Sequence, residues 1–218
     1  MKNQSVIILL FICIFCVKYT SGQIIIDVNG EPLKLIQLAE VDGSPFISKS
    51  WISGDAILAN GKMFKGIDLK YDEVKDALIF RGKEDKAFYF TDLIKEFNLN
   101  EKIFKSGFIP YKDFSSQSFF EIITSGKITL LKKNNKKIVE AKDYNSATTA
   151  KKVIDNFNFY IAKDNKIIAS QKDNLKMIAN ALDSKKSHDL VEFANNNKLN
   201  SKKEEDLKKI IDYYNKMP

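Results

Sequence analysis

The segment IDLKYDEVKDALIF, residues 67–80, decides the fold class that the sequence predicts. Apolar and polar residues alternate from Ile67 to Tyr71, and after an acidic turn an apolar run returns from Ala77 to Phe80. Alternation with a period of two is typical of a half-buried β-strand, and two strands joined by a short polar turn are typical of a β-hairpin. We therefore expect an antiparallel hairpin over this segment.

Short apolar runs of the same kind recur at intervals of roughly ten residues through the first two thirds of the chain. Turn pairs separate them, among them Asn60-Gly61, Asn134-Asn135 and Asp164-Asn165. Such residues tolerate the positive φ of tight hairpin turns, and no amphipathic helical pattern lies between the runs. Residues 23–171 are therefore expected to form an antiparallel β-meander, curved, sandwich-like or partly closed, in a mainly β protein of the α+β class.

The last part of the chain changes to a helical period. Apolar residues follow the spacing i, i+3, i+4, i+7, and Ser201-Lys202-Lys203-Glu204 has the pattern of a capping box. Residues 172–218 are expected to form about three short helices that pack on the sheet. The stripes that would face the sheet are Leu175, Ile178, Ala179 and Leu182, then Leu190, Phe193 and Ala194, and finally Leu207, Ile210, Ile211 and Tyr214.

The N-terminus has the layout of a secretory signal peptide. Lys2 precedes an apolar run from Val6 to Val17, and a short segment with small residues ends at Gly22. The run is shorter than the ~20 residues that span a bilayer, so we expect cleavage before Gln23 and no transmembrane span in the mature chain. Both cysteines of the chain lie in this apolar run and would be removed with the signal peptide. Their C-x-x-C spacing therefore predicts no redox site or metal site in the mature chain.

Composition limits the possible chemistry. A mature chain without cysteine excludes thiol catalysis, and His188 is the only histidine, so a multi-histidine metal site is excluded. The chain carries 35 Lys and Arg against 28 Asp and Glu, but Arg81 is its only arginine. Proteins that bind nucleic acids rely on the forked hydrogen bonds of arginine guanidinium groups, so we expect no nucleic-acid partner. We also expect no cofactor.

Two charged clusters are expected to be solvated turns. Asp72, Glu73 and Asp76 lie in the turn of the opening hairpin, without the spacing of a calcium loop. The basic run 132–137 surrounds Asn134-Asn135, which would be the tip of a hairpin. An alternative for this run is contact with anionic surface polymers or lipid headgroups.

Aromatic residues supply the candidate binding residues. The chain contains 16 Phe, 8 Tyr and 1 Trp, and most of them are expected in the core. The segment from Phe108 to Phe120 has the composition of a loop, where aromatic side chains are able to line a groove for an apolar ligand or a partner segment. The candidate contact residues are Phe108, Tyr111, Phe114, Lys132 and Lys133. No catalytic or metal-binding residue is predicted.

One series of motifs runs through most of the chain after residue 22. The motifs are Gly43-Ser44-Pro45-Phe46, Trp51, Gly54, Asn60-Gly61, Leu69-Lys70-Tyr71-Asp72, Phe119-Phe120-Glu121, Leu130-Leu131-Lys132-Lys133, Lys203-Glu204-Glu205-Asp206-Leu207 and Asp212-Tyr213-Tyr214-Asn215. Together they resemble the motifs of a group of exported proteins of Gram-negative bacteria whose function is uncharacterised. The resemblance implies export to the periplasm or the exterior, a β-rich body and a short helical tail, but it assigns no site residue.

The expected function is that of a non-enzymatic binding or scaffolding module of the cell envelope, with an envelope protein or an apolar ligand as partner. A filled core with an exposed apolar patch would favour this module. The alternatives are a carrier of an apolar small molecule, which a deep apolar pocket would favour, and a carboxylate-based hydrolase of envelope polymers. Two carboxyl groups about 5–10 Å apart in an open cleft would favour the hydrolase. The sequence leaves the oligomeric state open.

Overall fold

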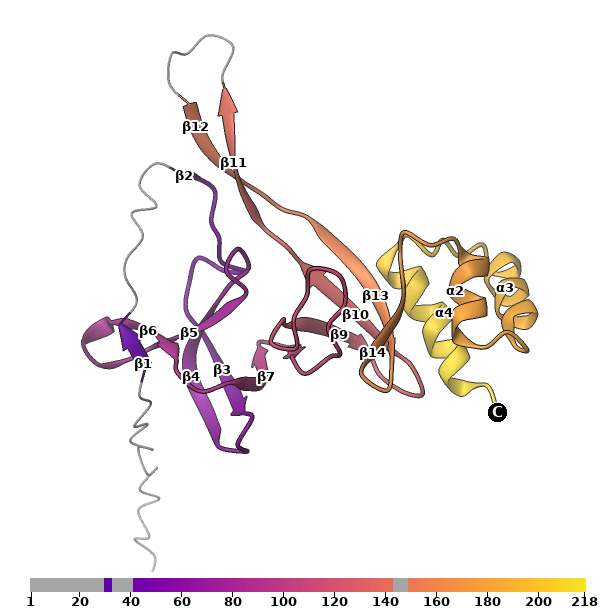
Figure 1. Cartoon of the computed structure of the whole chain (residues 1–218), viewed down its shortest axis with the longest axis horizontal. Coiled ribbons are helices and arrows are strands. Elements are labelled where there is room, and N and C mark those ends of the chain that lie inside the picture. Colours follow the sequence, from indigo (N-terminus) through magenta and orange to yellow (C-terminus); the bar gives the residue numbers. More distant parts are fainter. Residues whose placement is uncertain (1–29, 33–40, 143–148) are drawn as a thin grey trace, which may run out of the picture.

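The computed structural model describes residues 30–32, 41–142 and 149–218 (Figure 1). The predicted signal peptide, residues 1–22, lies outside these ranges. Within them the strands form one open sheet of eleven strands and one small sheet of three, and three α-helices lie near the C-terminus. The predicted mainly β, antiparallel fold with three C-terminal helices is thereby confirmed.

The large sheet is antiparallel throughout, and most spatial neighbours are also neighbours in the sequence, as in a meander. A short 3₁₀ turn, Lys83–Asp85, joins strand β5 (Ala77–Arg81) to strand β6 (Ala87–Phe90). In spatial order the strands are β1 (Gly30–Pro32), β6 (Ala87–Phe90), β5 (Ala77–Arg81), β4 (Met63–Asp72), β3 (Ile52–Leu58), β7 (Ile94–Leu99), β8 (Lys102–Lys105), β9 (Phe120–Thr124), β10 (Thr129–Asn134), β13 (Phe157–Lys163) and β14 (Lys166–Ser170).

The opening segment forms the β4–β5 hairpin, as its alternation predicts. Leu69 pairs with Phe80 and Tyr71 with Leu78 across the two strands. All four side chains are buried, and the Tyr71 ring lies 5.3 Å from the ring of Phe97 in β7. This aromatic cluster is the core of the first half of the sheet.

The second half of the sheet is covered on both faces. Leu130 of β10 and Phe159 of β13 pack under the helices, whereas Leu131 and Tyr160, their neighbours in the sequence, pack under the segment 106–119. Consecutive residues of a strand point to opposite faces, so a strand that is covered on both sides needs a continuous apolar run. For this reason these strands do not alternate in sequence.

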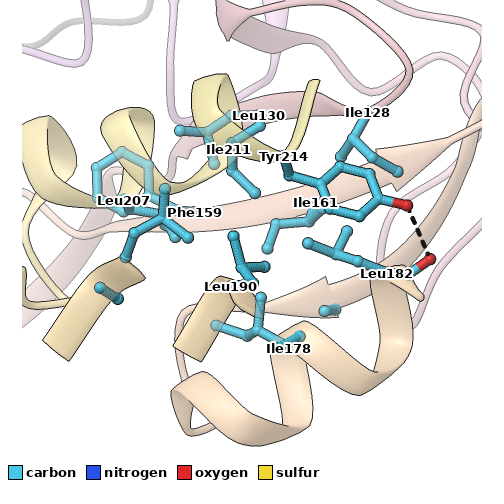
Figure 2. Close-up of a cluster of buried hydrophobic side chains, with 14 residues drawn as sticks. Ile128, Leu130, Phe159, Ile161, Ile178, Leu182, Leu190, Leu207, Ile211 and Tyr214 are labelled. Atoms are coloured by element: carbon cyan, nitrogen blue, oxygen red, sulfur yellow. Dashed lines mark hydrogen bonds between the residues drawn. The ribbon is translucent and has the colours of Figure 1, made fainter. Parts of the chain in front are cut away.

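The three helices bury most of their predicted stripes in one core with Leu130 of β10 and Phe159 of β13 (Figure 2). The predicted stripe residue Phe193 is the exception, because its side chain is half-buried and its ring stacks on Tyr213. They are α2 (Leu175–Leu182), α3 (Ser187–Asn196) and α4 (Glu204–Lys216). Leu207, Ile210 and Ile211 of α4 are completely buried, and the hydroxyl of Tyr214 donates a hydrogen bond of 3.3 Å to the carbonyl oxygen of Leu182. The helices are therefore held by their apolar stripes, as helices of this length require.

The predicted capping box of the last helix does not form. Lys203 is the N-cap residue of α4, and no side chain caps the first turn. The carboxylate of Glu204 accepts instead from the ammonium group of Lys132 at 2.8 Å, across the helix–sheet interface. At α2 the side chain of Asn174 caps the helix and accepts from the N–H of Met177.

The predicted hairpin at Asn134-Asn135 is wrong. The chain continues straight on from β10 into β11 (Lys137–Lys142) and returns through β12 (Thr149–Ile154) into β13. Thr129 pairs with Ala162, Asn134 with Phe157 and Lys142 with Thr149, so one unbroken register runs along the whole hairpin.

The outer half of this hairpin, β11 and β12, projects from the body as a ribbon (Figure 1). The short strand β2 (Val41–Asp42) joins the ribbon in parallel to β12 and completes the small sheet.

None of the helices within the described ranges combines the length and the apolar composition that crossing a bilayer requires.

We predict that Ile210→Ala destabilises the protein by roughly 2–4 kcal/mol, because it removes part of a completely buried side chain from the helix–sheet core. Lys208→Ala is the control, since its exposed ion pair with Asp212 contributes less than about 1 kcal/mol. Urea unfolding of the two variants measures the difference. Equal midpoints would show that the stripe of α4 does not stabilise the fold.

Candidate functional site

An open cleft of about 840 Å³ lies on the first half of the sheet. Its walls are formed by the start of β5, by β6, by residues 91–93, by β7 and the end of β8, and by the segment 106–119. The apolar side chains in the lining include Phe90, Leu93 and Ile94, and the polar ones include Asp76 and Gln117. Leu93 is 57% exposed, which makes it the most exposed large apolar side chain of the described residues.

A buried ion pair supports one side of the cleft. Asp76 lies at the end of the β4–β5 turn. Its carboxylate Oδ2 is 2.6 Å from the ammonium group of Lys133 in β10. Its Oδ1 accepts from the hydroxyl of Tyr71 at 2.5 Å and from the N–H of Phe119 at 3.3 Å. Lys133 also donates to the Phe119 carbonyl at 2.8 Å and to the Tyr71 hydroxyl at 3.3 Å. We call Tyr71, Asp76, Lys133 and the Phe119 backbone the lysine network.

Burial and charge shift the pKa values of two members of the lysine network, Lys133 and Tyr71. Burial lowers the pKa of Lys133, and the nearby Asp76 carboxylate opposes this shift. Burial, together with the same carboxylate, raises the pKa of Tyr71 well above its ordinary value. The ammonium has three polar partners, which is what a buried cation needs to offset its lost hydration.

A second lysine holds the other end of the β4–β5 turn. The ammonium group of Lys136 lies 3.1 Å from Oε2 of buried Glu73 and donates to the carbonyl oxygens of Phe46 at 2.7 Å and Ser44 at 3.2 Å. Asp155 of the ribbon lies 3.6 Å away. Lys136 therefore ties the segment 44–46, the turn and the base of the ribbon together.

The two charged clusters are thus not the solvated turns that the sequence predicts. Asp72 is also buried, and its carboxylate accepts from the N–H groups of Val74 and Lys75 at 2.9 Å each. Lys133 and Lys136 of the basic run pair with Asp76 and Glu73 of the acidic turn, whereas Lys132 pairs with Glu204.

Most of the acidic residues of the cleft are engaged in ion pairs. Three carboxylates line it, those of Asp76, Asp92 and Glu96. Asp76 is paired with Lys133, and Glu96 lies 2.9 Å from the ammonium group of Lys105. Asp92, the third, lies in the exposed connection before β7. Two of the three carboxylates that line the cleft therefore have a lysine partner.

The structure separates the five predicted contact residues. Phe108 lines the cleft, although its side chain is largely buried against Phe120. The rings of Tyr111 and Phe114 lie 6.1 and 5.4 Å from the ring of Tyr160 and cover the sheet.

Lys132 and Lys133 are neighbours in β10 and point to opposite faces. Lys132 contacts Glu204 on the helix side, and Lys133 belongs to the lysine network. The five residues therefore do not form one surface.

Leu93 lines the cleft but is not among the predicted contact residues. The sequence feature that indicates it is a large apolar residue inside the short polar connection after Phe90.

Comparison with protein-family models gave no match to this sequence, and comparisons with curated proteins and with solved structures gave none either. Among the described residues, no group of three or more His, Cys, Asp or Glu side chains has an arrangement suited to a metal ion. The proposal for function consequently depends on the cleft itself.

We predict that Lys133→Met costs roughly 1.5–3 kcal/mol of unfolding free energy, because it removes the charge-assisted contacts of this buried ammonium group with the Asp76 carboxylate and the Phe119 carbonyl oxygen. Lys105→Met is a matched control at the same cleft, and it should cost less than about 1 kcal/mol because that lysine is half-exposed. Chemical denaturation of both variants gives the comparison. Two small and equal losses would rule out a structural role for the lysine network.

We predict a pH-dependent contribution from Tyr71. Its pKa is higher in the folded than in the unfolded chain, so the folded state keeps the phenol proton longer. The stabilisation is complete below the ordinary value of 10.0 and is lost as the pH rises through the folded pKa. The difference in unfolding free energy between wild type and Tyr71→Phe should therefore be constant up to about pH 9.5 and shrink above pH 10. A difference that does not change with pH would contradict this assignment.

Proposed function

We propose that this chain is a non-enzymatic binding module of the cell envelope and that its cleft holds an extended segment of a partner protein. The observation that carries the proposal is an open cleft of about 840 Å³, lined by apolar and polar side chains together. The volume is in the range of ligand sites, roughly 300–1,000 Å³.

The lining suits a peptide. Leu93 is exposed and Phe90 and Ile94 are half-buried, so they offer contacts to apolar side chains of a partner. Ser116 and Gln117 also line the cleft and offer hydrogen-bonding groups to the partner's backbone. A site of this mixed kind is typical of peptide recognition, where backbone hydrogen bonds supply affinity and side-chain pockets supply specificity.

The wall of the cleft is prepared before binding. Asp76 is held by Lys133, by the Tyr71 hydroxyl and by the backbone of Phe119, so the turn beside the cleft does not need to become ordered when a partner arrives. A site that is already ordered loses less conformational entropy on binding and therefore binds more tightly.

The alternatives receive less support from the same cleft. A carrier of an apolar molecule would need an enclosed apolar pocket, whereas this cleft is open and carries charged groups such as Lys95 and Lys105. A carboxylate-based hydrolase would need a free acid and a free base, whereas Asp76 and Glu96 are each paired with a lysine.

Selection of linear peptides from a random phage library on the purified protein tests the proposal. Peptides selected on the wild type should bind Leu93→Asp at least about tenfold more weakly, because the substitution places a charge in the apolar part of the cleft. Met177→Asp is the matched control, since Met177 of α2 is 55% exposed against 57% for Leu93 and lies away from the cleft.

The outcome is decisive in either direction once thermal melting shows that both variants are folded. Loss of binding in Leu93→Asp alone supports the cleft as a peptide site. Failure to select any peptide, or equal binding to both variants, overturns the proposal.

A further inference from the structure

Among the residues that the structure describes, no strand pairs with the outer edge of β11 in the ribbon. In the small sheet the order is β11, β12, β2, so β11 lies on the outside. Strand β9 pairs with β10 only as far as Lys132 in the described part of the chain, and the ladder on that side then stops. An exposed strand edge is a template for another strand.

The register shows which backbone groups are free. The N–H of Asn135 donates to the carbonyl oxygen of Asn156 at 2.7 Å, so Asn135 faces into the hairpin. The register continues without a bulge, and residues of an antiparallel strand face alternately toward and away from their partner. Lys137 and Val139 therefore also face β12, and the backbone groups of Ile138 and Glu140 point outward.

The side chains along this edge are complementary to the same side chains of a second copy in antiparallel orientation. Lys136, Ile138 and Glu140 follow one another at a spacing of two and so share a face, with the order basic, apolar, acidic. When such a strand pairs antiparallel with its own copy about Ile138, Ile138 meets Ile138 of the second copy. At both ends Glu140 then lies opposite Lys136, whose ammonium group is also bound to Glu73 of its own chain.

The pairing also agrees with the strands behind the edge. Ile138 pairs with Val153 inside each ribbon, so the central row across both ribbons would be apolar from end to end. This row would cover Ile138, which is 42% exposed in the single chain.

The rows beside it would alternate in charge. Glu140 pairs with Lys151 within its own ribbon, and Asp155 lies beside Lys136. Across the two ribbons the order becomes Lys151, Glu140, Lys136 and Asp155, and each neighbouring pair is of opposite sign. Opposite charges on facing strands stabilise a sheet, whereas a register centred on Glu140 would place two glutamates together.

We propose that this chain forms a two-fold dimer by antiparallel pairing of the β11 edges, centred on Ile138. The contact is isologous, so it closes after two copies and leaves no further free β11 edge. It also places each ribbon in a wider sheet, and an isolated ribbon of two or three strands gains the most from such support. The contact does not involve the cleft, so it is independent of the proposed peptide site.

Sedimentation velocity over a range of concentrations tests this proposal. The wild type should show a monomer–dimer equilibrium, and Ile138→Lys should raise the dimer Kd at least about tenfold because it places two lysines at the two-fold axis. Ile103→Lys in β8 is the matched control, since Ile103 is 41% exposed against 42% for Ile138. The control should dimerise as the wild type does.

A backbone variant separates the edge from the side chains. Ile138→Pro removes an N–H group that points away from β12, so the inner ladder of the ribbon stays intact while the dimer is lost. Disulfide cross-linking of Ile138→Cys in a Cys13→Ser, Cys16→Ser background should join two copies at the axis.

Three results would overturn the proposal. They are a wild type that stays monomeric up to roughly millimolar concentration, a dimer that Ile138→Lys and Ile138→Pro leave unchanged, and equal weakening by the Ile103→Lys control.

Discussion

The ammonium group of Lys133 is the contact on which the arrangement of the chain depends. It lies in the interior between the carboxylate of Asp76, the hydroxyl of Tyr71 and the carbonyl oxygen of Phe119. Tyr71 belongs to the aromatic core of the first half of the sheet, and Lys133 lies in β10, which belongs to the second half. One buried cation therefore connects the cores of the two halves of the sheet.

Burial of this pair is better explained by register than by stability. Removing two charges from water costs several kcal/mol each, so such a pair contributes little more than an apolar pair of the same volume. It does, however, discriminate between registers, because a slip of one residue moves every side chain to the opposite face. In β10 a slip would move Lys133 into the apolar layer under the helices and would move Lys132 away from Glu204. The two neighbouring lysines fix the strand from its two faces.

The sequence predicts those parts of the fold that are encoded in local periodicity. The hairpin of residues 67–80 and the stripe of α4 follow from spacing alone, because each repeat faces one continuous core. The course of the chain through Asn134-Asn135 does not follow from local periodicity. The strand stays extended there because its lysines contact residues that are far away in the sequence. Lys133 and Tyr71 are 62 residues apart, and Lys136 and Ser44 are 92 apart. A local pattern of lysines and asparagines has the composition of a solvated turn, and it does not indicate which distant residues the lysines contact.

The same two lysines give the proposed binding surfaces a common support. Asp76, which Lys133 holds, lines the cleft, and Lys136 holds the base of the ribbon against the segment 44–46 and the β4–β5 turn. Loss of Lys133 would therefore loosen a wall of the cleft, and loss of Lys136 would release the ribbon at the point where it leaves the body. Leu93 and Ile138 differ from these lysines because their side chains are 57% and 42% exposed. We therefore expect their substitution to change the proposed binding and the proposed pairing with little effect on the fold, and this separates the two proposals from the stability of the body.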